Sequence, residues 1–341
     1  LRAIRIAQRL QFRLASSTSA LLLRDAPLLI NVAPERIRDE LLPIITLPVA
    51  ALALQMLDTY HLLPAIFPRL SESGILTAVN DTTKTKKEGR WKTFTSLSHL
   101  LRAFQGEPIS LSPHEQSLFS RCATIREEPA FKERWQNNHG NAYPRTTLLR
   151  FAALVYDMLP SPQEINAAHP EPLLQAIRND MQRLALGRQA ADFIIFLLCH
   201  AHVPWQIAPL PHSGAVRQWR AGRRYFQRFG EQGIDLAIFC LACQSARLEP
   251  LPPNKTDQEH EQILLDLLDA YYHAHEELIP PLLLDGQNMM AALEITSGPL
   301  VGALLAEVRS AQLDGTIQTR EEALRFAKDQ AARIGKRNKI T

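Results

Sequence analysis

The chain opens with Leu1-Arg2-Ala3-Ile4-Arg5-Ile6-Ala7-Gln8-Arg9-Leu10-Gln11-Phe12-Arg13-Leu14, a pattern that predicts an amphipathic helix. Apolar residues recur every three or four positions, which places them on one helix face. Arginines form a basic stripe beside that face: Arg2, Arg5, Arg9 and Arg13. No Ser, Thr, Asp or Asn precedes the stretch as a cap, so we expect the helix, and the protein with it, to start further upstream.

The same helical spacing recurs along nearly the whole chain, and strand-like alternation between hairpin turns is absent from the sequence. We therefore predict an all-α fold, built as an elongated array of many helices. Polar residues 71–90 predict a linker between a first module, residues 1–70, and a second, residues 91–248. The Pro-rich segment 249–255 precedes a third module, residues 257–341.

One helix of the third module has clear boundary signals. Ser297 is expected to cap a helix that begins at Pro299, and Gly315 to supply the left-handed turn after its end near Leu313.

Composition fits a globular protein, since 46% of the 341 residues are apolar and the net charge is only +3. No stretch reaches the roughly 18 to 20 continuous apolar residues of a membrane span, and no signal peptide is recognisable. We therefore expect a cytoplasmic protein without membrane contact. Cys240 and Cys243 lie at helical spacing in an apolar run, so we expect buried thiols instead of a zinc site.

Catalytic motifs are scarce in the sequence. A Gly-rich phosphate loop, a Ser/His/Asp elbow and a carboxylate pair on a strand are all absent. A group that could hold a divalent metal is His99, Asp157, His200 and His202. Because Tyr156 stands beside Asp157 where a stronger ligand is expected, we predict that these histidines are core or surface residues and that no metal is bound.

Four groups of motifs carry a family resemblance. They are Leu1 to Ala7, Glu35-Arg36-Ile37-Arg38-Asp39-Glu40-Leu41, Leu62-Leu63-Pro64-Ala65-Ile66-Phe67-Pro68, and the run from Ser297-Gly298-Pro299 to Leu313-Asp314-Gly315-Thr316-Ile317. Over almost the whole chain these residues resemble bacterial class II tRNA nucleotidyltransferases, the CCA-adding enzymes, and the similar bacterial poly(A) polymerases. The three modules then correspond to a neck, a degenerate HD-like body and a helical tail.

The resemblance implies roles for charged residues. Arg2 matches one of two neck arginines that select CTP or ATP, and Arg5 lies beside it as a second nucleotide-binding candidate. Three residues are expected to support the neck: Glu35, Arg36 and Glu40. Candidate contacts to tRNA phosphates, which arginine and lysine bind without regard to sequence, are Arg9, Arg217, Arg220, Arg224, Arg333, Lys336 and Arg337. Trp219, Tyr225 and Phe226 accompany them either as stacking platforms or as core.

The resemblance also implies two losses. In the body, Tyr156 replaces a His of the HD motif and Cys243-Gln244 stands where a last Asp is expected, so phosphohydrolase activity is expected to be lost. The catalytic head, whose Asp-x-Asp carboxylates would hold Mg²⁺ with CTP or ATP, has no counterpart in the sequence. We therefore expect this chain alone to be inactive.

We thus predict the RNA- and nucleotide-binding portion of an enzyme that adds CCA, or part of it, to tRNA 3′ ends. Two alternatives stay open: a poly(A) polymerase, and a headless, non-catalytic RNA-binding helical protein. The expected partners are tRNA and CTP or ATP, and a homodimer is also left open.

Overall fold

The computed structural model describes residues 1–72, 90–136, 142–159, 171–210, 216, 219–248 and 255–337. Within these ranges the regular secondary structure is helical and no strand occurs. The prediction of an all-α fold is confirmed. No helix in the described ranges is long and apolar enough to cross a membrane.

Two compact units make up the chain. The first contains Leu1–Gln206 and Asp235–Leu264, and the second contains Ile207–Ile234 and Leu265–Thr341. The predicted linker lies largely outside the described residues, and the boundaries of neck, body and tail stay a prediction.

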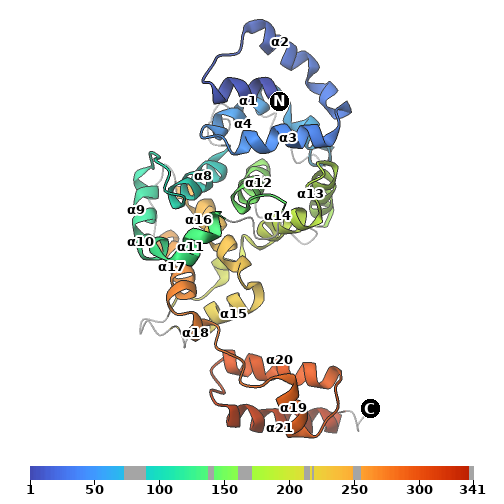
Figure 1. Ribbon diagram of the computed structural model, residues 1–341, viewed down its shortest axis with the longest axis vertical. Helices are drawn as coiled ribbons and strands as arrows, with labels where there is room; N and C mark the ends of the chain where they lie inside the picture. The colour runs from blue at the N-terminus through green and yellow to red at the C-terminus, as the bar shows by residue number, and fades with distance from the viewer. Residues whose placement is uncertain are drawn as a thin grey trace. The chain divides into compact units, whose positions relative to one another are not determined.

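The N-terminal part of the first unit is a set of short helices joined by short turns. They are α1 (Arg2–Arg9), α2 (Ser16–Asp25), the 3-10 helix η1 (Ala26–Asn31), α3 (Pro34–Ile45), α4 (Ala50–Thr59), α5 (Leu63–Ile66) and α6 (Pro68–Glu72). Helices α1, α3 and α4 pack on one another (Figure 1). Their shared core contains Ile4, Ile37, Leu41 and Leu54, each fully buried because the 3.6-residue period brings it to the inner face.

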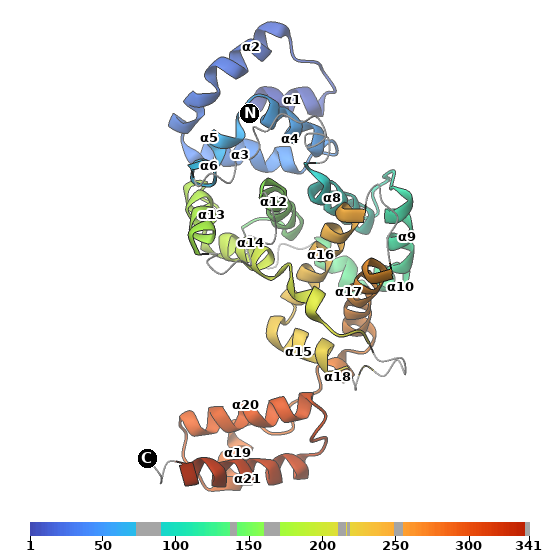
Figure 2. The ribbon, with the colours of Figure 1, turned by 180° about the vertical axis from the view of Figure 1, so that it is seen from behind.

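The remainder of the first unit surrounds α12. Its helices are α8 (Lys92–Phe104), α9 (Pro113–Arg121), α10 (Ala123–Glu127), α11 (Pro129–Gln136), α12 (Arg145–Met158), α13 (Glu171–Arg183), α14 (Arg188–His200), η4 (Val203–Gln206), most of α16 (Gln232–Leu248) and the first half of α17 (Lys255–His273). Helix α12 packs against both α8 and α14, and α13 packs against α14 (Figure 2). Because α12 has neighbours on several sides, it is apolar around most of its circumference.

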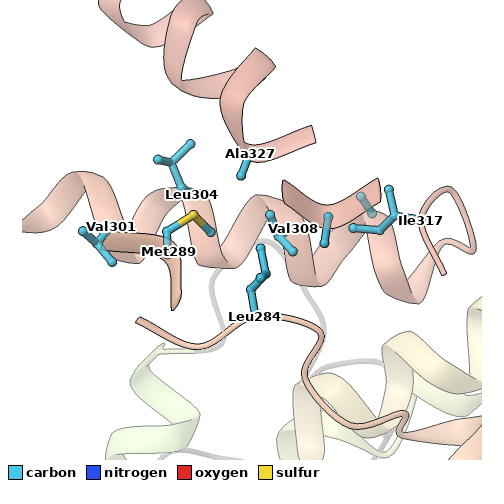
Figure 3. Packing of buried hydrophobic residues seen from close by; sticks show 9 residues of the cluster. Leu284, Met289, Val301, Leu304, Val308, Ile317 and Ala327 are labelled. Atoms are coloured by element: carbon cyan, nitrogen blue, oxygen red, sulfur yellow. The ribbon is translucent and has the colours of Figure 1, made fainter. Parts of the chain in front are cut away.

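The second unit contains α15 (Arg220–Phe229), the second half of α17, α18 (His275–Leu278), α19 (Gly286–Leu293), α20 (Pro299–Leu313) and α21 (Arg320–Arg337). Helices α19, α20 and α21 share a core in which Met289, Leu304 and Ala327 are fully buried (Figure 3). The predicted bounds of α20 agree with the structure, and Gly315 has the expected positive φ of 75°. The predicted Ser297 cap is wrong, because Gly298 is the N-cap residue and no side chain caps the helix.

Candidate nucleotide and RNA interface

A paired contact joins α1 to α3. The Nε and Nη2 atoms of Arg5 donate to the two carboxylate oxygens of Glu40 at 2.6 and 3.2 Å. Both side chains are largely withdrawn from solvent, with 21% and 26% of their surface exposed. The hydrogen bond from Arg5 lowers the pKa of Glu40. This bidentate contact links α1 to α3 with a defined geometry of the two side chains.

The other arginines of α1 point to solvent. Arg2 and Arg9 are seven residues apart, about two helical turns, so they lie on nearly the same face of α1, and both are exposed. Their face is opposite to that of Ile4 and Ala7, which are buried against α3 and α4. The charge of Arg2 also contributes to the lowered pKa of Glu40. The structure therefore gives Arg2 and Arg9 room to contact a ligand, whereas Arg5 is engaged with Glu40.

The remaining predicted neck residues, Glu35 and Arg36, lie in the first turn of α3 and are exposed. No ion pair of Arg36 within 4 Å occurs in the described part of the chain. A supporting role for Arg36 therefore has no visible contact behind it, and that prediction stays untested.

Asp157, one of the residues considered above as a possible metal ligand, caps a helix. It follows a full turn of apolar residues at the end of α12, and its carboxylate accepts a hydrogen bond of 2.8 Å from the backbone N–H of Phe94. That N–H lies in the first turn of α8, whose own N-cap residue, Trp91, offers no side-chain bond. Burial is the main cause that raises the pKa of Asp157 to about 7, against the opposing effect of the Phe94 bond.

The predicted histidines have separate neighbours. His99 Nδ1 lies 3.1 Å from both carboxylate oxygens of Glu115, whereas His200 Nδ1 lies 2.8 Å from the carbonyl oxygen of Phe196 on its own helix. The Nδ1 atom of His202 is buried, with no hydrogen-bond partner among the described residues.

Tyr156, the residue beside the cap, packs edge-to-face on Phe239 with ring centroids 5.5 Å apart. In the described ranges no three His, Cys, Asp or Glu side chains are placed to share a metal ion. His99, Asp157 and His200 each lie against a separate protein partner.

Three basic residues of the second unit lie on the exposed side of α15. Arg220, Arg224 and Arg228 are exposed and follow one another at four-residue intervals, the spacing of neighbours on a helix face. Arg224 pairs with Asp314 at 2.7 Å. The accompanying aromatic residues are core, since each is at most 3% exposed: Trp219, Tyr225 and Phe226. The helix therefore offers cations without stacking platforms.

Other predicted RNA contacts lie toward the end of the chain. Arg333 is exposed on α21. The side chains of Lys336 and Arg337 are not described, and Arg217 lies outside the described residues.

Sequence reasoning missed two features of the first unit. One is a group of exposed apolar side chains in the first 52 residues, among them Phe12 and Leu28 with 65% and 59% of their surface exposed. A run of leucines, as in α2 and η1, carries no sign of which side of the helix is covered. The other is Arg150, a single cation inside the apolar run Leu148-Leu149-Arg150-Phe151-Ala152, which could have been noticed for that reason.

Comparison with known proteins bears on the first unit most directly. Residues 11–73, which contain α2 to α6, match the family described as "Probable RNA and SrmB- binding site of polymerase A". The CC-adding tRNA nucleotidyltransferase of Geobacter sulfurreducens is 26% identical over 346 residues, covering 95% of this chain and 61% of that protein. The CC-adding tRNA nucleotidyltransferase of Synechocystis sp. is 31% identical over 125 residues, covering 36% of this chain and 26% of that protein.

The helical fold and the matched segment together support an all-α protein with an RNA-binding role. More narrowly, the matches support the family of CCA-adding tRNA nucleotidyltransferases and poly(A) polymerases, so the resemblance carried by the sequence motifs is confirmed. The chain spans about 61% of the length of the Geobacter relative.

Proposed function

We propose that this chain is the RNA- and nucleotide-binding portion of a tRNA nucleotidyltransferase that adds CC, or CC as part of CCA, to tRNA 3′ ends. The observation that carries the proposal is the similarity along 95% of the chain to a CC-adding tRNA nucleotidyltransferase. Nucleotidyl transfer requires carboxylates that hold two metal ions. We assign that step, with its Mg²⁺ and its CTP or ATP, to another part of the parent protein.

In this proposal α1 presents Arg2 to the incoming nucleotide. A guanidinium group donates paired hydrogen bonds in one plane, which suits both a base edge and a phosphate. The Arg5–Glu40 contact supports the proposal because it holds α1 on α3, and a rigid helix is needed to position a selecting side chain. Glu40 is then a positioning residue that acts through Arg5.

We assign the tRNA to the remaining exposed cations: Arg9 in the first unit, and Arg220, Arg224 and Arg333 in the second. These side chains suit backbone phosphates, and their contribution should fall as salt concentration rises. Arg224 already pairs with Asp314, so we expect it to contribute less than Arg220.

The experiment uses the full-length gene product with two substrates, a tRNA lacking CCA and a tRNA ending in CC, each with labelled CTP or ATP. We expect CTP to be added to the first substrate. In the same assay Arg2→Ala should raise the KM for CTP about tenfold, the loss of one charge-assisted contact. The matched control is Arg188→Ala, which removes an arginine that is 95% exposed on α14. If neither tRNA is extended, the enzymatic proposal fails.

A poly(A) polymerase is the second candidate, favoured by the words "polymerase A" in the description of the family that residues 11–73 match. It predicts long adenylate tails on an unrelated RNA primer supplied with ATP alone. Addition confined to tRNA and to two cytidylates rules this candidate out. RNA binding without any nucleotide addition would favour the non-catalytic alternative.

A further inference from the structure

A cavity of about 540 Å³ lies in the first unit, beside the first turn of α12. Its walls come from that turn, from the C-terminal end of α8 and the residues after it, from Trp135 of α11 and from the segment between α3 and α4. We call it the α12 pocket. It is separate from the exposed face of α1 that carries Arg2 and Arg9, since no residue of α1 lines it.

Arg150 lines the pocket, and its burial is unusual for a cation. Only 6% of its surface is exposed, yet no hydrogen bond or ion pair to it occurs among the described residues. Burial is the main cause that lowers the pKa of Arg150 to about 10, so the guanidinium is still charged at pH 7. A buried cation without a partner is costly, and proteins usually pair such groups.

Further donors face the same space. Thr146 and Thr147, in the first turn of α12, line the pocket, and their hydroxyl groups make no hydrogen bond within the described ranges. The N-cap residue of this helix is Pro144, which provides no side-chain cap, so the positive end of the helix dipole is open toward the pocket. Trp135 adds a buried indole Nε1–H without a partner in the described part of the chain.

The charges in the pocket sum to a positive value. Arg102 pairs with Glu107 at 2.7 Å at the rim, where 47% of the Glu107 side chain is exposed. One carboxylate therefore neutralises one of two guanidinium groups, and Arg150 is left to attract an anion. Donors that converge from a guanidinium, two hydroxyls and a helix end suit a ligand with several acceptor oxygens around one centre.

We propose that the α12 pocket binds a phosphate group, with Arg150 at its base and the first turn of α12 as the second wall. The phosphate comes either from a free anion, such as inorganic phosphate or pyrophosphate, or from an RNA backbone. The site follows from the geometry of the first unit and does not rest on the proposed nucleotidyltransferase function.

In the first arm of the test, inorganic phosphate or pyrophosphate is titrated into the full chain, and binding is measured by isothermal titration calorimetry. The second arm measures binding of tRNA lacking CCA at fixed ionic strength. Each is repeated with Arg150→Met, which keeps an unbranched side chain as far as the position of Nε but removes the charged end, and with Arg188→Met as a matched control. We expect Arg150→Met to weaken binding at least tenfold in one arm, and the control to change it less than twofold.

If Arg150→Met binds the free anions more weakly in the first arm, the pocket is assigned to a free anion. If Arg150→Met is weakened only in its binding of tRNA in the second arm, the pocket is assigned to an RNA phosphate. The proposal is overturned if the wild-type protein binds no phosphate and Arg150→Met binds tRNA as tightly as Arg188→Met does. Glu107→Gln tests it without altering Arg150, since removal of the one carboxylate should raise the affinity several-fold. An affinity that is unchanged or lower in Glu107→Gln contradicts the proposal even where Arg150→Met proves unstable.

Discussion

The cap formed by Asp157 makes the stability of the protein depend on pH. The ordinary pKa of this carboxyl is 3.8, and in the folded chain it is about 7. Between these values the native state holds a proton that the unfolded state has released. Stability from this group is therefore fully present below about pH 4 and is lost as the pH rises through 7. The shift is equivalent to at most about 4 kcal/mol.

The perturbation is Asp157→Asn, which keeps an acceptor oxygen for the Phe94 N–H but cannot ionise. Urea unfolding followed by circular dichroism at pH 4.5, 6 and 8 gives the free energy of unfolding of both proteins. The difference, wild type minus Asp157→Asn, should fall by about 2 to 4 kcal/mol across this range. The contributions of the other acidic groups to the pH dependence are the same in both proteins and cancel in that difference. Asp192→Asn, at a carboxyl group that is 48% exposed on α14, is the control.

A flat difference for Asp157→Asn would refute the reasoning, since it would mean that the carboxyl titrates equally in both states. A difference that rises with pH would refute it more strongly. That sign is expected of a carboxylate held ionised by a bound cation, because its pKa would then be lowered instead of raised.

Three further substitutions test packing and backbone geometry through the free energy of unfolding. Gly222→Ala should destabilise the protein by about 1 to 3 kcal/mol, because the added Cβ would lie 2.4 Å from the Trp219 ring. Its control is Gly302→Ala, whose Cβ meets open space and which should be neutral or stabilising. If the two substitutions change the free energy of unfolding equally, the packing argument is contradicted. Glu294→Gly should stabilise by about 0.5 to 1 kcal/mol, because Glu294 ends α19 with a φ of 53°, and a loss of stability would argue against strain. Asp180→Ala should lower the free energy of unfolding by about 1 to 3 kcal/mol, because the buried carboxylate accepts hydrogen bonds from the backbone N–H groups of Arg69 and Leu70 at 3.1 and 2.9 Å. An unchanged midpoint of unfolding would show that water replaces the carboxylate as acceptor.

Local rules predicted the features that depend on nearby residues. The bounds of α20 follow from Pro299 and Gly315 because proline favours a helix start and glycine tolerates positive φ. Periodicity placed Trp219 and Tyr225 on a helix but could not say whether their face is covered. That depends on which other helices pack there, and helix spacing alone carries no such information.

Contacts between distant residues were beyond prediction from the sequence. Arg5 and Glu40 are 35 positions apart, and Phe94 and Asp157 are 63 apart. Asp157 was noticed as part of a motif, yet its observed role as a cap depends on where α8 begins relative to α12. Arg150 stands out in the sequence as a cation in an apolar run, but its burial and its lack of a partner among the described residues depend on how the surrounding helices pack.

The interleaving of the two units affects the order in which a growing chain can fold. The first unit needs residues 235–264, so its last helices can join only after residues 207–234 have already been synthesised. Those 28 residues belong to the second unit, and their partners begin at Leu265. During synthesis the aromatic face of α15, which is buried in the folded protein, is therefore still exposed while the first unit folds. Such an exposed intermediate is prone to aggregation and is a natural substrate for chaperones.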